Sequence, residues 1–297
     1  MICPRTASAS AYRGQRSARR CVRPLGVCAA AFLLTLAFAA RASADWLDTT
    51  GLRGTLSPQG YSRWDGLNAG ATFGLSNMNT DFGSSAGSLI AYSLRNTTVE
   101  AELAPSSWTT LPNSTTNGRQ YGAFIGYNMQ WDQLVIGFQG AYNRVSSSET
   151  GAADHINRIA TTSDTYANTI DITAQSSSQL IDYATFGARL GYAMGQFLPY
   201  AVIAGAAGRF NYSISETTTV SGTSATATPA TYGPNTDSQS SSKNNAVVGG
   251  FMVGLGMDVA VLPNVFLRAE WEFVAFAPVS GIRTDINTGR VGLGIKF

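Results

Sequence analysis

Few side chains of this sequence combine the types and the spacing that catalysis or metal binding requires. The single histidine, His155, lies in a polar segment, and Ser147, Ser148 and Glu149 precede it closely. A hydrolase needs a nucleophile, a base and an orienting acid within reach of one another, but serine-rich segments create such neighbours by chance. A second hypothesis is that His155 and Tyr166 bind haem or a metal, but a single histidine defines little of a coordination geometry. We therefore expect no enzymatic activity and no cofactor.

The N-terminal segment has the pattern of a secretory signal peptide. Residues 1–24 contain six arginines and no acid, and residues 25–40 form an apolar run. Ala42 and Ala44 supply the small residues of a cleavage site that precedes Asp45. The alternative is a membrane anchor, for which the apolar run is short. We predict export, with cleavage after Ala44.

The composition changes once this leader is set aside. All three cysteines lie in it, so the remaining chain has no disulfide, no thiolate metal site and no cysteine nucleophile. The remaining chain keeps 13 basic and 18 acidic side chains, and 13% of the whole sequence is charged, against about 25% in ordinary soluble domains. This argues against a cytosolic enzyme and against a nucleic-acid binder. An exported, cysteine-free, glycine-rich chain is instead typical of a transmembrane β-barrel.

Alternation of apolar and polar residues predicts eight strands, each long enough to cross a bilayer when tilted, which takes about 9–11 residues. A soluble sandwich shares such alternation, but the glycines and opposite charges on the polar faces suit a narrow filled interior. The fold class is therefore all-β, an eight-stranded antiparallel up-and-down transmembrane β-barrel over residues 63–297. The eight segments are 63–76, 120–131, 133–144, 181–193, 198–211, 246–260, 265–275 and 289–297.

The connections alternate in length, which predicts the orientation of the barrel. Tight turns are expected near Asp132, Gly195 and Pro263. Short turns on one rim and long loops on the other are typical of outer-membrane barrels, with the long loops outside the cell. An even number of strands then leaves both termini in the periplasm, with 45–62 as a short lead-in. The long loops are 78–118, 147–178, 212–243 and 277–288.

The loop over residues 212–243 has a composition that predicts no regular structure. Serine and threonine make up 16 of its 32 residues, and few of its side chains are apolar. Such low-complexity composition cannot bury a core of its own, so we expect this loop to be mobile.

Each strand has an apolar face, expected toward lipid, and a polar face, expected toward the lumen. In segment 198–211 the apolar face is assigned to Tyr200, Val202 and Phe210, with Arg209 on the opposite face. Aromatic residues near the strand ends predict two interfacial girdles. One girdle comprises Trp131, Tyr192, Tyr200 and Phe297, and the other comprises Tyr121, Tyr142 and Phe210.

Charged side chains on the polar faces predict the state of the lumen. They form either an ion-selective lining or a plug of ion pairs, and eight strands enclose just enough room for side chains, which favours the plug. Counting outward from the Pro263 turn places Asp258 opposite Arg268, and Glu272 opposite or diagonal to Arg290. The predicted lumen charges are Arg189, Arg209, Asp258, Arg268, Glu270, Glu272, Arg290 and Lys296.

Four strings of residues carry a resemblance to a known family. They are YGAFIGYNMQWDQLVIGFQGAYNRV, FGARLGYAMGQFLPYAVIAGAAGRF, GGFMVGLGMDVAVLPNVFLRAEWEFVAF and the ending GRVGLGIKF. In their order and hairpin spacing they resemble the small outer-membrane β-barrel surface proteins of alpha-proteobacteria, within the wider class of eight-stranded, OmpA-type barrels and the porin-like superfamily. The resemblance covers roughly residues 61–297 apart from the loops. The family typically has a carboxylate where Gln139 stands, a departure that changes the lumen charge.

The resemblance also implies a role for the C-terminus. Phe297 ends an alternating strand with Ile295, Leu293 and Val291 on the same face, and such an ending resembles the signal read by the barrel-assembly machinery. An open edge strand gives a receptor something to pair with. The alternative is that Phe297 is only a girdle aromatic, and the two are compatible.

The sequence therefore predicts a non-catalytic outer-membrane protein that contributes to envelope structure and displays surface loops. Its expected partners are outer-membrane lipid and lipopolysaccharide and the barrel-assembly machinery, with no nucleic acid. A small-solute porin is the first alternative, and a loop-borne adhesin or ligand-binding protein is the second. The loops match no known motif, so the identity of a host or surface ligand stays open.

Overall fold

The computed structural model describes residues 63–146, 148–226 and 229–297, all within one compact unit of the chain. The predicted signal peptide, its cleavage site at Ala42, Ala44 and Asp45, and the predicted lead-in over 45–62 lie outside the described residues. The helices are α2 (Gly87–Ser93) and α3 (Thr98–Leu103), followed by a short 3-10 turn over Pro105–Ser107. The strands are β1 (Gly66–Asp81), β2 (Ser114–Trp131), β3 (Leu134–Ser146), β4 (Glu149–Thr161), β5 (Tyr166–Tyr192), β6 (Phe197–Ser224), β7 (Thr231–Leu262), β8 (Val265–Phe276) and β9 (Arg283–Lys296).

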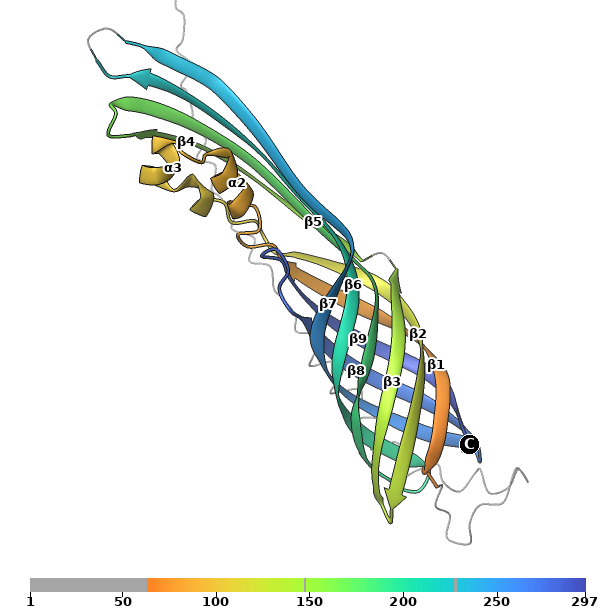
Figure 1. Ribbon diagram of the computed structural model, residues 1–297. Helices are drawn as coiled ribbons and strands as arrows, with labels where there is room; N and C mark the ends of the chain where they lie inside the picture. Colours follow the sequence, from red (N-terminus) through yellow and green to blue (C-terminus); the bar gives the residue numbers. More distant parts are fainter. Residues whose placement is uncertain (1–62, 147, 227–228) are drawn as a thin grey trace, which may run out of the picture. The chain divides into compact units, whose positions relative to one another are not determined.

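Eight of the nine strands close into a ring of antiparallel neighbours (Figure 1). The order is β3-β2-β1-β9-β8-β7-β6-β5, and β3 pairs with β5 to complete the circle. The ninth strand, β4, pairs with β5 beyond the ring. The predicted eight-stranded up-and-down barrel is confirmed, and the number of strands in the sheet exceeds the prediction by one. No helix of the described residues has the length and apolar character needed to cross a membrane.

Three tight turns join strands at one end of the ring, as the spacing predicted. The β2–β3 turn places Asp132 at φ 51°, and the β5–β6 turn places Gly195 at φ 64°. Glycine adopts this left-handed backbone without the strain that a Cβ atom adds. The β7–β8 turn consists of Pro263 and Asn264, between Leu262 and Val265. These turns set the register of the hairpins and therefore decide which residues face each other across the lumen.

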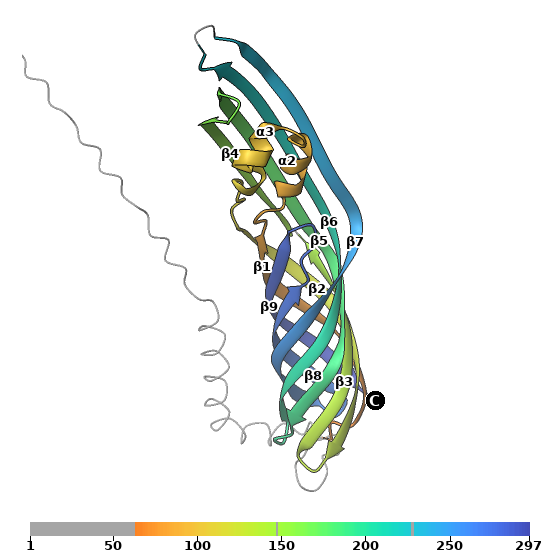
Figure 2. The same cartoon turned by 60° about the vertical axis from the view of Figure 1, so that its left-hand side comes forward.

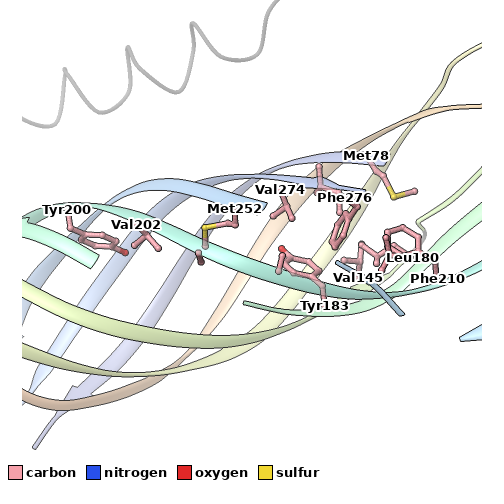
Figure 3. Close-up of a cluster of buried hydrophobic side chains, with 14 residues drawn as sticks. Met78, Val145, Leu180, Tyr183, Tyr200, Val202, Phe210, Met252, Val274 and Phe276 are labelled. Atoms are coloured by element: carbon pink, nitrogen blue, oxygen red, sulfur yellow. The ribbon is translucent and has the colours of Figure 1, made fainter. Parts of the chain in front are cut away.

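The interior of the ring is filled with side chains, and its apolar residues form two clusters, the larger of which is drawn in Figure 3. Tyr183, Val202, Met252 and Phe276 of this cluster are each at most 3% exposed. Glycines on the inward faces make room for the large rings. A Cβ atom at Gly256 would lie 2.5 Å from the ring of Tyr200, a distance at which atoms overlap.

Strands β5, β6 and β7 continue beyond the ring and, with β4, form a four-stranded sheet that we call the extension (Figures 1 and 2). Its pairing reaches Tyr166 opposite Ser224. The register shifts between Leu180 and Asp182 and between Phe210 and Tyr212. Such bulges bend and twist strands, and here they lie where the ring ends and the extension begins.

The extension corrects the expectation that 147–178 and 212–243 are loops without regular structure. Residues 149–161 and 166–178 are strand, as are 212–224 and 231–243. These strands could not be recognised in the sequence, because serine-rich segments show no alternation of apolar and polar side chains. Threonine nevertheless fits extended backbone well, and each strand here has a neighbour that supplies its hydrogen bonds.

The segment between β1 and β2 covers one face of the extension. Helix α2 places Ile90 at 0% exposure and Leu94 at 4% against Ile172 and Ile214 of the sheet. Helix α3 is capped by Thr97, whose hydroxyl accepts a hydrogen bond from the Glu100 amide at 3.2 Å. The predicted loop 78–118 is corrected at both ends, since 78–81 belong to β1 and 114–118 to β2. The residues between these strands supply the apolar cover that the extension needs.

Candidate functional site

The lumen contains a cluster of charged groups centred on Asp258. Residues Asp258 and Arg268 lie opposite each other in the β7–β8 ladder, which confirms the pairing expected from the turn. Arg268 donates from Nε to Asp258 Oδ1 at 2.8 Å and from Nη2 to Oδ2 at 3.0 Å. Arg189 of β5 also donates to Oδ2. All three side chains are at most 2% exposed, so one carboxylate binds two buried guanidinium groups.

A second cluster inverts this arrangement, with one guanidinium between two carboxylates. Arg290 lies opposite Glu270 in the β8–β9 ladder. It is diagonal to Glu272, one of the two arrangements expected for that pair. Its Nη2 donates to Glu270, and its Nη1 lies 3.1 Å from Glu272 Oε2. The same Nη1 donates to Asn143 Oδ1 at 3.0 Å. Buried charges need partners of opposite charge, and in both clusters each charged side chain has one within 3.1 Å. Arg189 Nε, Arg290 Nε and Glu272 Oε2 make no hydrogen bond of their own with any described residue.

Aromatic and amide side chains connect the two clusters. Tyr200 donates its hydroxyl to Glu270 Oε2 at 2.5 Å, and Tyr183 donates to Glu272. The Arg189 guanidinium lies 3.5 Å from the Tyr200 ring centre, a favourable cation–π geometry. Gln139 Oε1 accepts from Arg268 Nη1 at 2.8 Å. The neutral amide thus supplies a hydrogen bond to this arginine without adding a negative charge.

Arg209 was assigned to the lumen, and the structure places it outside. Its side chain is 46% exposed and donates to Asp182 from Nε at 2.7 Å. Tyr142 donates its hydroxyl to the same carboxylate at 2.7 Å. The assignment of the two faces of 198–211 was reversed, so Tyr200 and Phe210, expected in the girdles, are buried inside at 5% exposure. Alanine lies on both faces of this segment, and Ile203 on one face is matched by Val202 on the other, so alternation alone could not orient it.

Lys296 and the C-terminal residues lie at the end of the ring that carries the tight turns. Lys296 Nζ donates to the Arg63 carbonyl at 2.8 Å and lies 4.3 Å from the Trp64 ring centre. The Phe297 amide donates to the Leu67 carbonyl at 2.9 Å, and the Phe297 side chain is 75% exposed. In the closed ring β9 pairs on both edges, with β1 and with β8. An assembly role for Val291, Leu293, Ile295 and Phe297 therefore concerns the chain before closure and stays a prediction.

His155 lies in β4 and does not meet the groups that chemistry would need. Its Nε2 is 3.0 Å from Asp171 Oδ2, and Asn157 donates to the same oxygen at 2.9 Å. Hydrogen bonds from Asn157 and His155 lower the pKa of Asp171 below its ordinary value. Tyr166 instead packs against Tyr232, and the Ser148 hydroxyl donates to a backbone carbonyl. Within the described residues, no group of His, Cys, Asp or Glu is arranged to hold a metal.

Comparison with known families settles the class. Residues 30–297 match the family described as outer membrane protein beta-barrel domain. The chain belongs to this family. The apolar outward faces of the ring fit that membership, because Phe186, Ile203 and Val291 are each at least 61% exposed and need lipid around them. The protein is thus a β-barrel of the outer membrane.

Solved structures of outer-membrane barrels are similar to this chain at low identity. Neisserial surface protein A is 12% identical, with 78% of this chain and 98% of that chain covered and a TM-score of 0.34. Ail, the attachment invasion locus protein of Yersinia pestis, is 11% identical, with 78% and 99% covered and a TM-score of 0.29. OprG of Pseudomonas aeruginosa is 11% identical, with 80% and 98% covered and a TM-score of 0.29. No curated protein matches the sequence.

Proposed function

We propose that this protein is a non-catalytic outer-membrane barrel with a closed lumen, and that it holds the extension at the cell surface as part of the envelope. The observation that carries the proposal is the lumen network. Asp258 with two arginines and Arg290 with two glutamates occupy the interior at almost no exposure. A barrel of eight strands has room for little more than its own side chains, so an interior filled by these ion pairs and their aromatic neighbours leaves no hydrated path for a solute.

The proposed orientation has the extension outside the cell and both termini in the periplasm. The tight turns at Asp132, Gly195 and Pro263 support it, because periplasmic turns of such barrels are short and surface connections long. Lipid and lipopolysaccharide would then surround the ring, and the barrel-assembly machinery would insert it. We also propose that the chain is related to the small outer-membrane surface proteins of alpha-proteobacteria that its sequence resembles.

Planar-bilayer conductance separates this proposal from the porin alternative. Purified protein inserted into a bilayer is expected to give little or no steady current. A large, stable conductance of the unaltered chain would overturn the closed lumen and favour the small-solute porin.

A peptide tag inserted between Ser224 and Ala230 tests the orientation. Antibody is expected to reach the tag on intact cells, since the β6–β7 hairpin ends there. A tag inserted beside Asp132, in a tight turn, is the matched control and is expected to be reached only after lysis. The reverse result would contradict the proposed orientation.

The size of the extension specifically favours the second alternative, a surface adhesin or ligand-binding protein. Strands β5, β6 and β7 extend well past the ring and are paired almost to their ends, which is more structure than closing a barrel needs. Replacing 213–242 with a short turn is expected to leave the ring assembled, because the ring pairings lie outside this range. Loss of cell adhesion in that variant would support the alternative, and unchanged adhesion would count against it.

A further inference from the structure

A cleft of about 590 Å³ lies between the helical segment and the distal part of the extension. Its volume falls within the range of about 300–1,000 Å³ that is typical of small-molecule sites. One wall comes from the end of α2 and the start of α3, and the other from β6, β7 and the β4–β5 turn. The lining residues that the following argument uses are Val99, Asp164, Tyr166, Val220, Tyr232, Asn235 and Asp237.

Two tyrosines and aliphatic side chains give the cleft an apolar surface. Tyr166 and Tyr232 pack edge to face, with ring centres 5.3 Å apart. The Tyr232 hydroxyl donates to Asn168, which holds that ring in place. Val99 is 3% exposed and Val220 is 8% exposed. A preorganised aromatic surface beside aliphatic groups suits a ligand that has an apolar face of its own.

Polar groups project into the same cleft from the sheet. Asn235 lies opposite Val220 and Asp237 opposite Thr218 in the β6–β7 ladder, on the face that meets the helices. Across the cleft, Asp164 accepts from the Thr98 hydroxyl at 3.2 Å. An amide both donates and accepts, and a carboxylate accepts from several donors. This combination suits a ligand with many hydroxyl groups.

The charge of the lining selects among such ligands. Asp164 and Asp237 are acidic, and none of the described residues that line the cleft is basic. The nearby Arg95 points elsewhere, since its guanidinium lies 4.0 Å from the Tyr92 ring centre and donates to the Tyr92 carbonyl at 3.0 Å. Unpaired like charges oppose binding, so a sulfated or carboxylated ligand is disfavoured.

We propose that this cleft binds a short neutral oligosaccharide. Sugar rings combine an apolar face of C–H groups with a rim of hydroxyls, which matches the tyrosine surface and the amide and carboxylate beside it. The neutral character follows from the two aspartates and from the absence of a lining cation among the described residues. This site is separate from the lumen. It gives the extension a ligand of a defined chemical class, a neutral oligosaccharide.

The test uses the full chain in lipid nanodiscs on a printed array of neutral, sialylated and sulfated glycans, with spermine binding measured separately by calorimetry. Binding to one or more neutral glycans is expected. Binding to no glycan, binding confined to acidic glycans, or binding of spermine in place of every neutral glycan would each overturn the proposal.

Variants locate the binding in this cleft. Asn235→Ala is expected to weaken the affinity for the bound neutral glycan about tenfold, the loss of one well-placed polar contact, and Tyr166→Ala by at least as much. Ser240→Ala is the matched control, because Ser240 lies on β7 opposite Ser215, on the other face of the sheet. Heat-modifiable gel migration verifies folding of each variant. If Asn235→Ala binds as tightly as Ser240→Ala, the glycan does not occupy this cleft.

Discussion

Strand β6 passes through both regions of the molecule, and its outward face differs between them. In the ring its outward side chains are apolar, as Ile203 at 61% exposure illustrates, whereas inward Tyr200 reaches the buried charges. In the extension its outward side chains are hydroxylated, such as Thr217, and inward Ile214 is 2% exposed in an apolar cluster. The pairing shifts register beside Phe210, and there the outward face changes from apolar to hydroxylated, while the inward face carries apolar side chains in both regions.

The difference shows that the surroundings of a sheet decide its side chains. The outward face of the ring meets lipid, and its interior is too narrow for anything but side chains, which must then satisfy one another. The outward face of the extension carries hydroxyl groups that pair across strands, as Thr217 and Ser238 do at 3.0 Å. Its inner face needs an apolar cover, which α2 supplies through Ile90. The following changes test this contrast.

The largest effect is expected in the lumen. Asp258→Ala leaves Arg189 and Arg268 buried without their carboxylate, which is expected to lower the free energy of unfolding by about 3–5 kcal/mol. Urea unfolding in lipid vesicles measures it. Lys243→Ala, which removes an exposed charge of the extension, is the control and is expected to change stability by less than about 0.5 kcal/mol.

A double-mutant cycle sharpens this result. The combination of Asp258→Ala with Arg268→Ala is expected to cost less than the two single changes added, because fewer charges are then left unpaired. Strict additivity would show that the two residues do not interact as an ion pair.

A lysine on the outward face should distinguish the two parts of β6 directly. Ile203→Lys places a charge against lipid near the middle of the ring and is expected to destabilise folding by about 2–4 kcal/mol. Thr217→Lys, on the same face in the extension, is expected to change stability by less than about 0.5 kcal/mol. Folding yields in vesicles across a urea series measure both. Equal costs would mean that the outward faces share one environment.

Deletion of Phe297 tests whether the ring depends on its last strand before closure. The assembled amount is expected to fall severalfold while the signal peptide is still removed, because an edge-recognition feature is lost. Heat-modifiable migration on gels quantifies assembly. Phe251→Leu removes an outward aromatic that is 50% exposed and keeps the terminus, so it should assemble normally. Normal assembly of the deleted chain would contradict the role.

The smallest effect concerns pH at the outer strand of the extension. Asp171 has a pKa below its ordinary value of 3.8 because Asn157 and His155 hydrogen-bond to its carboxylate. The stabilisation is complete above that ordinary value and is lost as pH falls through the lowered pKa. Protease cleavage of β4 should therefore rise at low pH. In Asp171→Asn the rise of cleavage at low pH should disappear. If cleavage of that variant still rises at low pH, groups other than Asp171 cause the rise.

The hairpins of the ring were predictable because local signals agreed there. Alternation and the turns at Asp132, Gly195 and Pro263 defined the strands, and counting from Pro263 paired Asp258 with Arg268. The outward position of Arg209 was not predictable, because alanine and branched apolar residues occupy both faces of its strand in 198–211. Its partner Asp182 carried no signal either, since the register shift beside Leu180 turns it outward.

The sequence by itself determined the fold class, the tight turns and most of the inward charges, because side-chain alternation and turn chemistry are local properties. Only the tertiary structure decided that 212–243 is largely strand, that 147–178 contains β4, and which face of β6 is inside. The physical reason is that these choices depend on neighbours distant in sequence. A serine-rich segment becomes strand when an adjacent strand completes its hydrogen bonds and α2 covers the apolar face, and a near-symmetric strand is oriented by the register of its partners.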